Sequence, residues 1–347
     1  MDRYIGIDVH KESCTVVVLG PTGKRLREAQ VETNGKALRA FLATIAGRKH
    51  LCIEEGTHAE WIYETLEPAV DEIVVTIPDK EAGQKSDSLD AWKRADELRR
   101  GAISRTVFKA PDRFTSLRAA AKAYRVTQRD MVRVKTRVTA LYRARGINEP
   151  GATLHGPEQR QQAMTLLSPA LQRLAQLLYE ELDALVLAHE HSHAWLNEEA
   201  KKVPIVKLLA TAPGIGEIRA AQIVATVISP HRFRTRRQFW SYCGLGIVTR
   251  SSSDWVRSAE GNWNRRQLQK TRGLNRNRQP ILKAAFTGAA VTVIQQMHQH
   301  PLYQAYDKLV AAGTKPNLAR LTLARRIAAA VLAMWKHKEK YHTQKPH

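Results

Sequence analysis

Cysteine is scarce in this chain, and long apolar runs are missing from it. The 347 residues include three cysteines, Cys14, Cys52 and Cys243, whose wide spacing fits neither a disulfide framework nor a CxxC metal site. No apolar stretch approaches the roughly 20 residues that span a bilayer, and the first residues lack the basic segment and apolar core of a secretory signal. We therefore expect a cytoplasmic protein without a membrane partner.

Acidic residues are nearly missing from the last third of the chain. Residues 201–347 hold 26 Lys and Arg against 5 Asp and Glu, whereas residues 1–110 hold 17 against 18 and residues 111–200 hold 12 against 10. The net charge of +22 is thus concentrated in one region, which is typical of proteins that bind nucleic acid through its phosphates. The alternative is a solvated basic surface. Three tryptophans in the same region offer faces for base stacking: Trp240, Trp255 and Trp263.

Residues 1–110 alternate β-rich apolar runs with helical patterns. Two strands joined by the turn Gly20-Pro21-Thr22-Gly23, together with a third strand and then alternating helices and strands, predict a mixed-sheet α/β domain. The expected strands are 3–9, 13–19, 24–32, 50–54 and 72–77, and the expected helices are 35–46, 59–67 and 87–101.

A heptad pattern over residues 115–145 predicts a long helix, which ends at Gly146 and Pro150. A second long helix follows with a leucine stripe. The two helices fit a coiled-coil hairpin or a plain helical bundle, and the pattern alone favours neither. The heptad positions are Leu117, Ala120, Tyr124, Thr127, Met131, Val134, Val138 and Leu141, and the stripe is Leu171, Leu174, Leu178 and Leu185.

The basic third begins with an apolar helix, the sequence Pro213-Gly214-Ile215-Gly216 and a second helix over 217–227. This order is typical of a helix-hairpin-helix, in which glycine N–H groups approach a phosphate closely. A simple turn between two helices is the alternative.

Four carboxylates stand where they can meet at one point. Asp8 interrupts the first β-rich run, Glu54 ends another, and Asp87 and Asp90 share one face of an expected helix. An acid inside a buried strand is costly unless a positive charge pairs with it, and this set contains no arginine to compensate it. Oxygen ligands suit Mg²⁺ or Mn²⁺, which clamp the oxygens of phosphoryl transfer. We therefore expect a divalent-metal centre in which neutralising any one acid relieves repulsion in the metal-free protein.

A second metal motif is less persuasive. His189-Glu190-His191-Ser192-His193 matches the H-E-x-x-H pattern of zinc peptidases. The segment continues a leucine stripe towards Trp195, and no third ligand is evident. We interpret it as a solvated or lightly packed helix face.

At the acidic residues the sequence resembles the IS110 family of insertion-sequence transposases, which includes Piv-type DNA invertases. Gly6-Ile7-Asp8-Val9-His10-Lys11, Glu54 and Lys85-Ser86-Asp87 with Asp90 resemble the DEDD set of its RuvC-like domain. The likeness covers nearly the whole chain. Motifs that resemble the family's second transposase domain are Pro213-Gly214-Ile215-Gly216, Arg232-Phe233, Tyr242-Cys243-Gly244-Leu245, Ser251-Ser252-Ser253 and Ala324-Arg325-Arg326.

The resemblance implies an order of domains. An α/β RNase H-like (RuvC-like) DEDD domain is expected over 1–110, and a helical, coiled-coil hairpin or linker over 111–200. A basic, mainly α transposase domain that bears the serine and a helix-hairpin-helix-like element is expected over 201–347.

The resemblance also implies a composite catalytic centre. The metal ligands are then Asp8, Glu54, Asp87 and Asp90, and the nucleophile is Ser252, eight residues after Gly244. A serine that attacks a DNA phosphate gives a covalent phosphoserine, which conserves the energy of the phosphodiester for rejoining. We expect residues 246–258 to form a loop, in which Asp254 is the only acid near the serine, so its activation must come from the metal centre of the same or another subunit.

The partners implied by the family are donor DNA, target DNA and a structured bridge RNA that pairs with both, while the protein reads backbone and shape. A homo-oligomer, dimer or tetramer, in a bacterial nucleoid is implied as well. The residues predicted to contact nucleic acid are Gly214, Gly216, Arg250, Arg257, Arg265, Arg266, Lys270, Arg272, Arg276 and Arg278.

The sequence departs from the family pattern at two sites. Glu54-Glu55-Gly56-Thr57 reverses a usual Thr-Gly pair and leaves Glu55 as an alternative ligand, and Ser251 or Ser253 is an alternative nucleophile. Gly246-Ile247 also stands where the family has Ala-Pro. Two other functions compete with the transposase: a metal-dependent endonuclease for branched DNA such as Holliday junctions, and a non-catalytic nucleic-acid-binding protein.

Overall fold

The computed structural model describes residues 1–77, 86–103, 114–252, 255–265 and 269–342. The chain divides into two compact units, Met1–Arg113 and Phe114–His347. The division into three domains stays a prediction. None of the described helices is long and apolar enough to cross a membrane.

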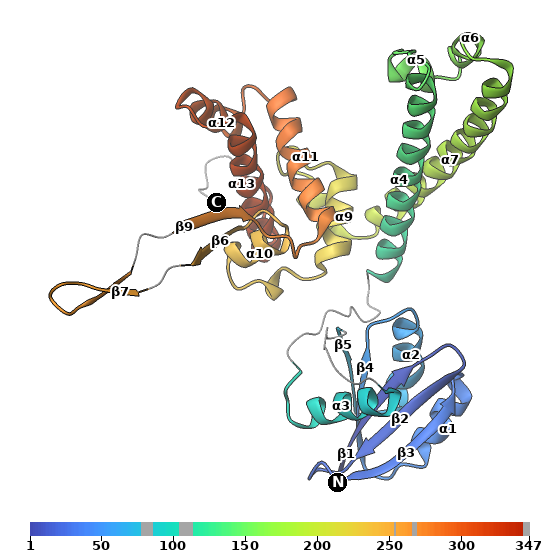
Figure 1. The fold of residues 1–347 in the computed structure, drawn as a ribbon, viewed down its shortest axis with the longest axis vertical. Helices are drawn as coiled ribbons and strands as arrows, with labels where there is room; N and C mark the ends of the chain where they lie inside the picture. The colour runs from blue at the N-terminus through green and yellow to red at the C-terminus, as the bar shows by residue number, and fades with distance from the viewer. Residues whose placement is uncertain (78–85, 104–113, 253–254, 266–268, 343–347) are drawn as a thin grey trace. The chain divides into compact units, whose positions relative to one another are not determined.

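The N-terminal unit is built on a five-stranded mixed sheet (Figure 1). Strand order is β3-β2-β1-β4-β5, with β1 antiparallel to β2 and β2 to β3, and with β4 parallel to both β1 and β5. This mixed sheet with its helices confirms the predicted α/β class and is consistent with an RNase H-like domain. The strands are β1 (Asp2–Val9), β2 (Ser13–Leu19), β3 (Arg25–Glu32), β4 (Arg48–Glu54) and β5 (Glu72–Thr76).

Helices cover both faces of this sheet, as the alternation of side chains along β1 requires. Ile5 and Ile7 pack into the core beneath α1 and α2, whereas Tyr4 packs on the other face with Ala91 and Ala95 of α3. Gly6 lies on the α3 face too, because a Cβ there would come within 1.8 Å of the Ala91 carbonyl oxygen. The helices are α1 (Gly35–Ala43), α2 (Ala59–Leu66), the 3-10 turn η1 (Glu67–Ala69) and α3 (Asp87–Arg99).

The second unit begins with a hairpin of two long helices, α4 (Thr115–Arg143) and α7 (Pro169–Lys201), joined at its tip by α5 (Gly151–His155) and α6 (Arg160–Thr165) (Figure 1). All the predicted heptad positions on α4 are buried or half-buried. The prediction that the leucine stripe forms the packed face of α7 was partly wrong. Leu174 is 45% exposed, and Ala175, Tyr179 and Leu182 are buried.

The base of the hairpin shares a core with the basic third. Leu117 of α4 and Leu196 of α7 lie in the same buried cluster as Phe239 and Phe286. The C-terminal region is mostly helical, as predicted. Its helices are α8 (Pro204–Leu209), α9 (Glu217–Val227), η2 (Pro230–Arg232), α10 (Arg236–Tyr242), α11 (Pro280–Gln296), α12 (Pro301–Ala311) and α13 (Pro316–His337).

Strands interrupt these helices where a loop was predicted, so the expectation of a loop over 246–258 was wrong. The backbone pairs antiparallel in two short ladders. The apolar side chains described on these strands, such as those of Ile247 and Val256, are exposed, so they provide no buried apolar alternation. The strands are β6 (Ile247–Ser252) paired with β9 (Gln269–Leu274), and β7 (Trp255–Arg257) paired with β8 (Trp263–Arg265).

The predicted helix-hairpin-helix lies at α8 and α9. Gly214 turns the chain with φ of +71°, and a Cβ there would come within 2.3 Å of the Ala289 carbonyl oxygen on α11. Gly216 is exposed and caps α9. The turn therefore needs glycine at 214 for packing, while the backbone at Gly216 remains open to a ligand.

Candidate metal centre and serine strand

Asp8 lies at the carboxyl end of β1, on the face that α3 covers. Ile5 and Ile7 point to the opposite face, so the period of the strand turns Tyr4, Gly6 and Asp8 towards α3. The Asp8 side chain is 22% exposed. The acid in the first buried strand is thus neither in open solvent nor in the apolar core.

His10 joins Asp8 to Asp87. Its Nε2 lies 3.1 Å from Asp8 Oδ2 and 3.2 Å from Asp87 Oδ2. One ligand atom from each of these three residues lies within 4.8 Å of the others, and the described ranges contain no other such group of three or more His, Cys, Asp or Glu. The sequence reasoning overlooked His10, although it stands two residues after Asp8 in the quoted motif.

Asp87 and Asp90 occupy the first turn of α3, which Ser86 caps by accepting a hydrogen bond from Leu89 N at 3.2 Å. Acids in a first turn interact favourably with the helix dipole. The same turn brings Asp87 to His10 and lets the charge of Asp90 act on Asp8. The cap and the close packing at Gly6 thus fix where these carboxylates lie.

Glu54 ends β4 and is compensated by an arginine, which corrects the expectation that the acidic set has none. Arg94 of α3 donates from Nε to Glu54 Oε1 at 2.8 Å, and its Nη2 contacts the same oxygen. Its Nη1 lies 3.0 Å from Glu97 Oε2. The Arg94 side chain is 9% exposed. Arg94 follows Asp90 by four residues, which is one helical turn and was a usable signal.

The pKa of the Asp8 carboxyl is raised above its usual value. Burial is the main cause, and the negative charges of Asp87, Asp90 and Glu54 add to it, while His10 acts in the opposite direction. A carboxyl that other carboxylates destabilise gains most when a cation arrives. The centre is therefore short of positive charge even with His10 beside it.

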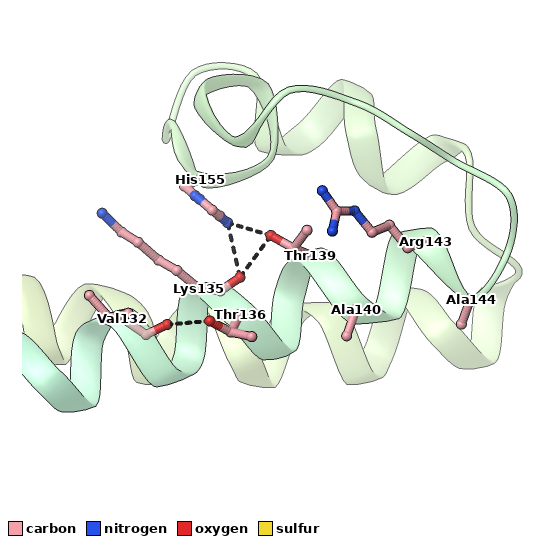
Figure 2. Close-up of a pocket in the computed structure, with 8 residues that line it drawn as sticks. All are labelled: Val132, Lys135, Thr136, Thr139, Ala140, Arg143, Ala144 and His155. Carbon is pink, nitrogen blue, oxygen red and sulfur yellow. Dashed lines mark hydrogen bonds between the residues drawn. The ribbon is translucent and has the colours of Figure 1, made fainter. Parts of the chain in front are cut away.

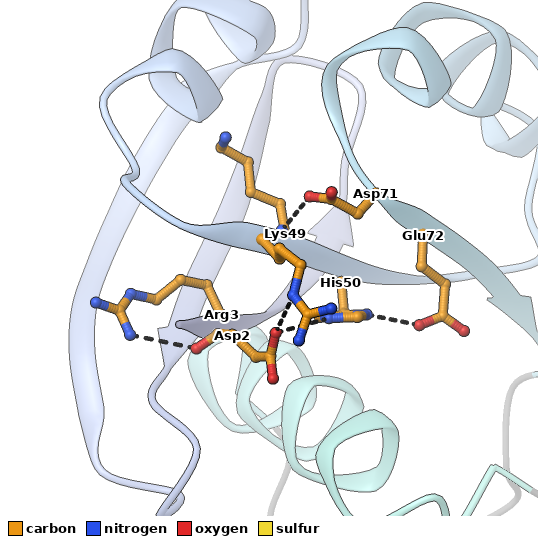
Figure 3. Close-up of polar contacts among 7 residues, drawn as sticks. Asp2, Arg3, Lys49, His50, Asp71 and Glu72 are labelled. Atoms are coloured by element: carbon orange, nitrogen blue, oxygen red, sulfur yellow. Dashed lines mark hydrogen bonds and ion pairs between the residues drawn. The ribbon is translucent and has the colours of Figure 1, made fainter.

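At the opposite end of the sheet, where β1, β4 and β5 begin, the acids have partners within the protein (Figure 3). Arg48 Nε donates to Asp2 Oδ1 at 2.8 Å, and His50 Nδ1 lies 2.7 Å from Glu72 Oε2. The Asp71 carboxylate accepts a hydrogen bond from Lys49 N at 2.7 Å. The hydrogen bond from Arg48 lowers the pKa of Asp2 below its usual value. Each of these acids has a partner within the protein, so none of them needs a metal.

The donor set at Asp8 fits a divalent cation. Carboxylate oxygens are the ligands that Mg²⁺ prefers. Mn²⁺ accepts the same oxygens together with an imidazole nitrogen. Glu55, the alternative ligand, is exposed at the start of the segment after β4, and its backbone N–H donates to Thr76 O at 2.7 Å. Which glutamate binds metal stays a prediction.

Ser252 lies at the end of β6 and pairs with Gln269, next to Ser251, which pairs with Lys270. Ser253, Asp254 and Arg266 lie outside the described residues. Ser252 belongs to the second compact unit and the carboxylates to the first. The role of Ser252 therefore stays a prediction.

The turn that leads into β6 is held by the family-like motifs. Gly244 has φ of +69°, and a Cβ there would come within 2.0 Å of the Arg278 side chain. Arg325 Nε donates to Leu245 O at 2.7 Å, and Trp240 Nε1 donates to Arg325 O at 2.9 Å. Trp240 is half-buried and its Nε1 makes a structural contact, so the expectation that its ring offers a stacking face stays a prediction.

The residues predicted to contact nucleic acid lie partly on the paired strands and partly outside them. Arg250, Arg257, Arg265, Lys270 and Arg272 lie on the paired strands β6 to β9. Arg276 is exposed after β9, whereas Arg278 is half-buried against Gly244 and donates from Nη1 to Asn275 O at 3.3 Å. The strands therefore carry five of the ten predicted residues.

The helical hairpin holds a groove of about 650 Å³ along α4 (Figure 2). Lys135 and Arg143 line it together with His155, whose Nε2 lies 3.1 Å from Thr139 Oγ1. Burial lowers the pKa of His155. Because no acid lines this groove, it is not a competing metal centre.

The H-E-x-x-H histidines pack against α4. His189 Nδ1 lies 3.1 Å from Thr127 Oγ1, and the Tyr124 ring lies tilted against both His189 and His193, at 4.7 and 5.8 Å between ring centroids. This packing agrees with the interpretation of a lightly packed helix face.

Two family models match the chain. The model of DEDD-type IS110 transposases, described as Transposase, matches residues 5–144 and so contains Asp8, Glu54, Asp87 and Asp90. The model described as Transposase IS116/IS110/IS902 family matches residues 206–307, from α8 to α12. No curated protein matches the chain.

Proposed function

This chain belongs to the IS110 family of DNA transposases, and on that premise we propose that it cuts and rejoins DNA with a metal-binding carboxylate centre and the nucleophile Ser252. The observation that carries the proposal is the meeting of Asp8 and Asp87 at the end of β1, 3.1 and 3.2 Å from His10 Nε2. Two carboxylates that meet around one nitrogen can also share a metal ion.

Asp8, Asp87, Asp90 and Glu54 are the proposed metal ligands. A bound Mg²⁺ or Mn²⁺ would stabilise charge on the phosphate and on the attacking and leaving oxygens. Arg94 holds Glu54 in place through Nε, so this carboxylate is oriented before a metal arrives. His10 supplies a donor nitrogen or a counter-charge beside Asp8 and Asp87.

Ser252 is the proposed nucleophile. Its oxygen forms an ester bond to the scissile phosphorus as the phosphodiester P–O bond breaks, and the proton of the serine ends on the released DNA hydroxyl. The number of phosphate ester bonds is unchanged, so the hydroxyl of another strand can reverse the step and reseal the backbone. A serine hydroxyl needs activation at neutral pH, and the carboxylate centre of the same or a partner subunit supplies it.

The basic residues of the second unit are proposed to bind DNA and a guide RNA. Their concentration favours phosphate contacts, which position a nucleic acid without reading its sequence. Base pairing by a bridge RNA would then choose the donor and target sites, as the family resemblance implies. Sequencing the RNA that copurifies with the protein from its host tests this, and recovery of no discrete RNA species would contradict it.

A trapping assay with end-labelled DNA tests the serine step. Wild-type protein with Mn²⁺ should give a covalent protein–DNA adduct, and Ser252→Ala should bind DNA normally but form none. The matched controls are Ser251→Ala and Ser253→Ala, which keep the adduct. If Ser251→Ala or Ser253→Ala loses the adduct while Ser252→Ala retains it, the nucleophile has been misassigned.

The second candidate is a metal-dependent endonuclease, which the presence of Asp8, His10 and Asp87 together in the first unit, apart from Ser252 in the second, also favours. It predicts cleavage of branched DNA with no adduct from any variant. Mixing inactive Asp87→Ala with inactive Ser252→Ala separates the schemes further. Recovered recombination in the mixture would mean that serine and carboxylates come from different subunits of an oligomer.

A further inference from the structure

The β7–β8 hairpin presents two exposed tryptophans on one of its faces. Trp255 is 55% exposed and Trp263 is 62% exposed. Trp255 pairs with Arg265, and Arg257 pairs with Trp263. Because residues two apart and residues directly opposite share a face, Trp255, Arg257 and Trp263 lie together, and Val256 and Asn264 lie on the other face.

The two tryptophans are diagonal neighbours across the ladder. Such positions are about 7–8 Å apart, which is roughly twice the 3.4 Å spacing of stacked bases. Two rings carried on backbone positions at that separation have room for one base between them when their planes face each other. Arg257 lies in the same face, with its Nε donating to Gly261 O at 3.2 Å. This hydrogen bond restrains its positive charge on the hairpin, where the charge can attract a phosphate of the same nucleotide.

The chain connects this face directly to the proposed nucleophile. Trp255 follows Ser252 by three residues, which an extended chain spans in at most about 11 Å. Residues 247–278 carry eight Lys and Arg against two Asp and Glu. This charge favours a polyanion over a second copy of a chain whose net charge is +22.

We propose that the Trp255–Arg257–Trp263 face binds unpaired DNA nucleotides next to the phosphate that Ser252 attacks, by stacking a base between the tryptophans. Stacking requires a base whose faces are open, which a closed duplex does not offer. The inference rests on the proposed function, because the position of the phosphate comes from the role of Ser252.

Fluorescence anisotropy of the full-length protein with labelled oligothymidine, oligouridine and a fully paired, blunt-ended DNA duplex tests the proposal. Trp255→Ala and Trp263→Ala should each weaken oligothymidine binding about tenfold and leave duplex binding unchanged. Trp255→Phe should retain most of the affinity, because it still stacks. Val256→Ala, on the other face of the hairpin, is the matched control and should change nothing.

The salt dependence separates stacking from charge. The tryptophan variants should keep the wild-type slope of log affinity against log salt, whereas Arg257→Ala should reduce it by about 1. Equal losses on duplex and oligothymidine, or a loss on oligouridine alone, would overturn the proposal. So would a change of oligomeric state in sedimentation velocity, which would make the face an interface between copies. The Ser252 adduct assay is independent: if adducts form while the tryptophan variants bind normally, only this inference fails.

Discussion

The two ends of strand β1 carry the same kind of side chain in opposite electrostatic settings. Asp2 begins the strand beside Arg48, and its pKa is lowered. Asp8 nearly ends it among Asp87, Asp90 and Glu54, and its pKa is raised, chiefly by burial. One end has a positive partner for its acids, and the other has more acid than its cations compensate. Acidic residues by themselves therefore do not identify a metal site. An excess of acids over their positive partners does.

The largest expected effect is on recombination. Asp87→Ala/Asp90→Ala should lower activity about a thousandfold or more, because several kcal/mol of transition-state stabilisation depend on the metal. Asp2→Asn, at the balanced end, should leave activity within about twofold. A plasmid recombination assay measures both. Full activity in the double variant would remove the metal centre from the account.

Gly6→Ala should disturb the acidic centre at the end of β1 without changing any charged side chain. The new methyl group would come within 1.8 Å of the Ala91 carbonyl oxygen, so α3 must shift and carry Asp87 and Asp90 with it. Overpacking of this kind costs about 1–3 kcal/mol. Thermal melting and Mn²⁺ titration should both show the loss. Gly56→Ala, where a Cβ has open space, is the matched control.

Glu54→Gln should lower stability in the metal-free protein, unlike the other acids of the centre. Arg94 is buried, and the change leaves it with a weaker partner beside Glu97, at a cost of about 1–3 kcal/mol. Asp8→Asn should instead raise stability in EDTA, because it removes a carboxylate that burial and repulsion destabilise. Chemical denaturation measures both changes. If Glu54→Gln stabilises as Asp8→Asn does, Arg94 does not compensate Glu54.

The smallest effect is a difference in pH dependence between Asp2 and Asp8. The lowered pKa of Asp2 gives stability that is present above its unfolded value and lost as pH falls through the folded one. The raised pKa of Asp8 has the opposite sign: its charge costs stability at neutral pH, and the cost disappears as pH falls through the raised value. Melts of Asp2→Asn and Asp8→Asn against wild type in EDTA, from neutral to acid pH, should therefore converge on wild type from opposite sides.

Local patterns predicted most of the N-terminal unit. The five strands and three helices lie within a few residues of the predicted ranges, because each apolar run has a turn or cap such as Gly20 or Ser86 at its edge. His10 and Arg94 were missed because only acids were considered as members of the site, whereas these two residues are partners of the acids at neighbouring positions. Strands β6 to β9 were missed because the apolar side chains described on them, such as those of Ile247 and Val256, are exposed and impose no buried apolar period.

Calorimetric titration of Mn²⁺ into protein freed of metal tests the central claim most directly. Wild type and Asp2→Asn should bind with the same affinity, whereas Asp8→Asn and Asp87→Asn should each show little or no binding heat. The binding heat reports the metal directly. Equal far-ultraviolet circular dichroism of all four proteins would show that a loss of heat is not a folding defect. Equal binding by Asp8→Asn and wild type, or no binding by wild type, would contradict the claim that the unbalanced end of β1 holds a divalent cation.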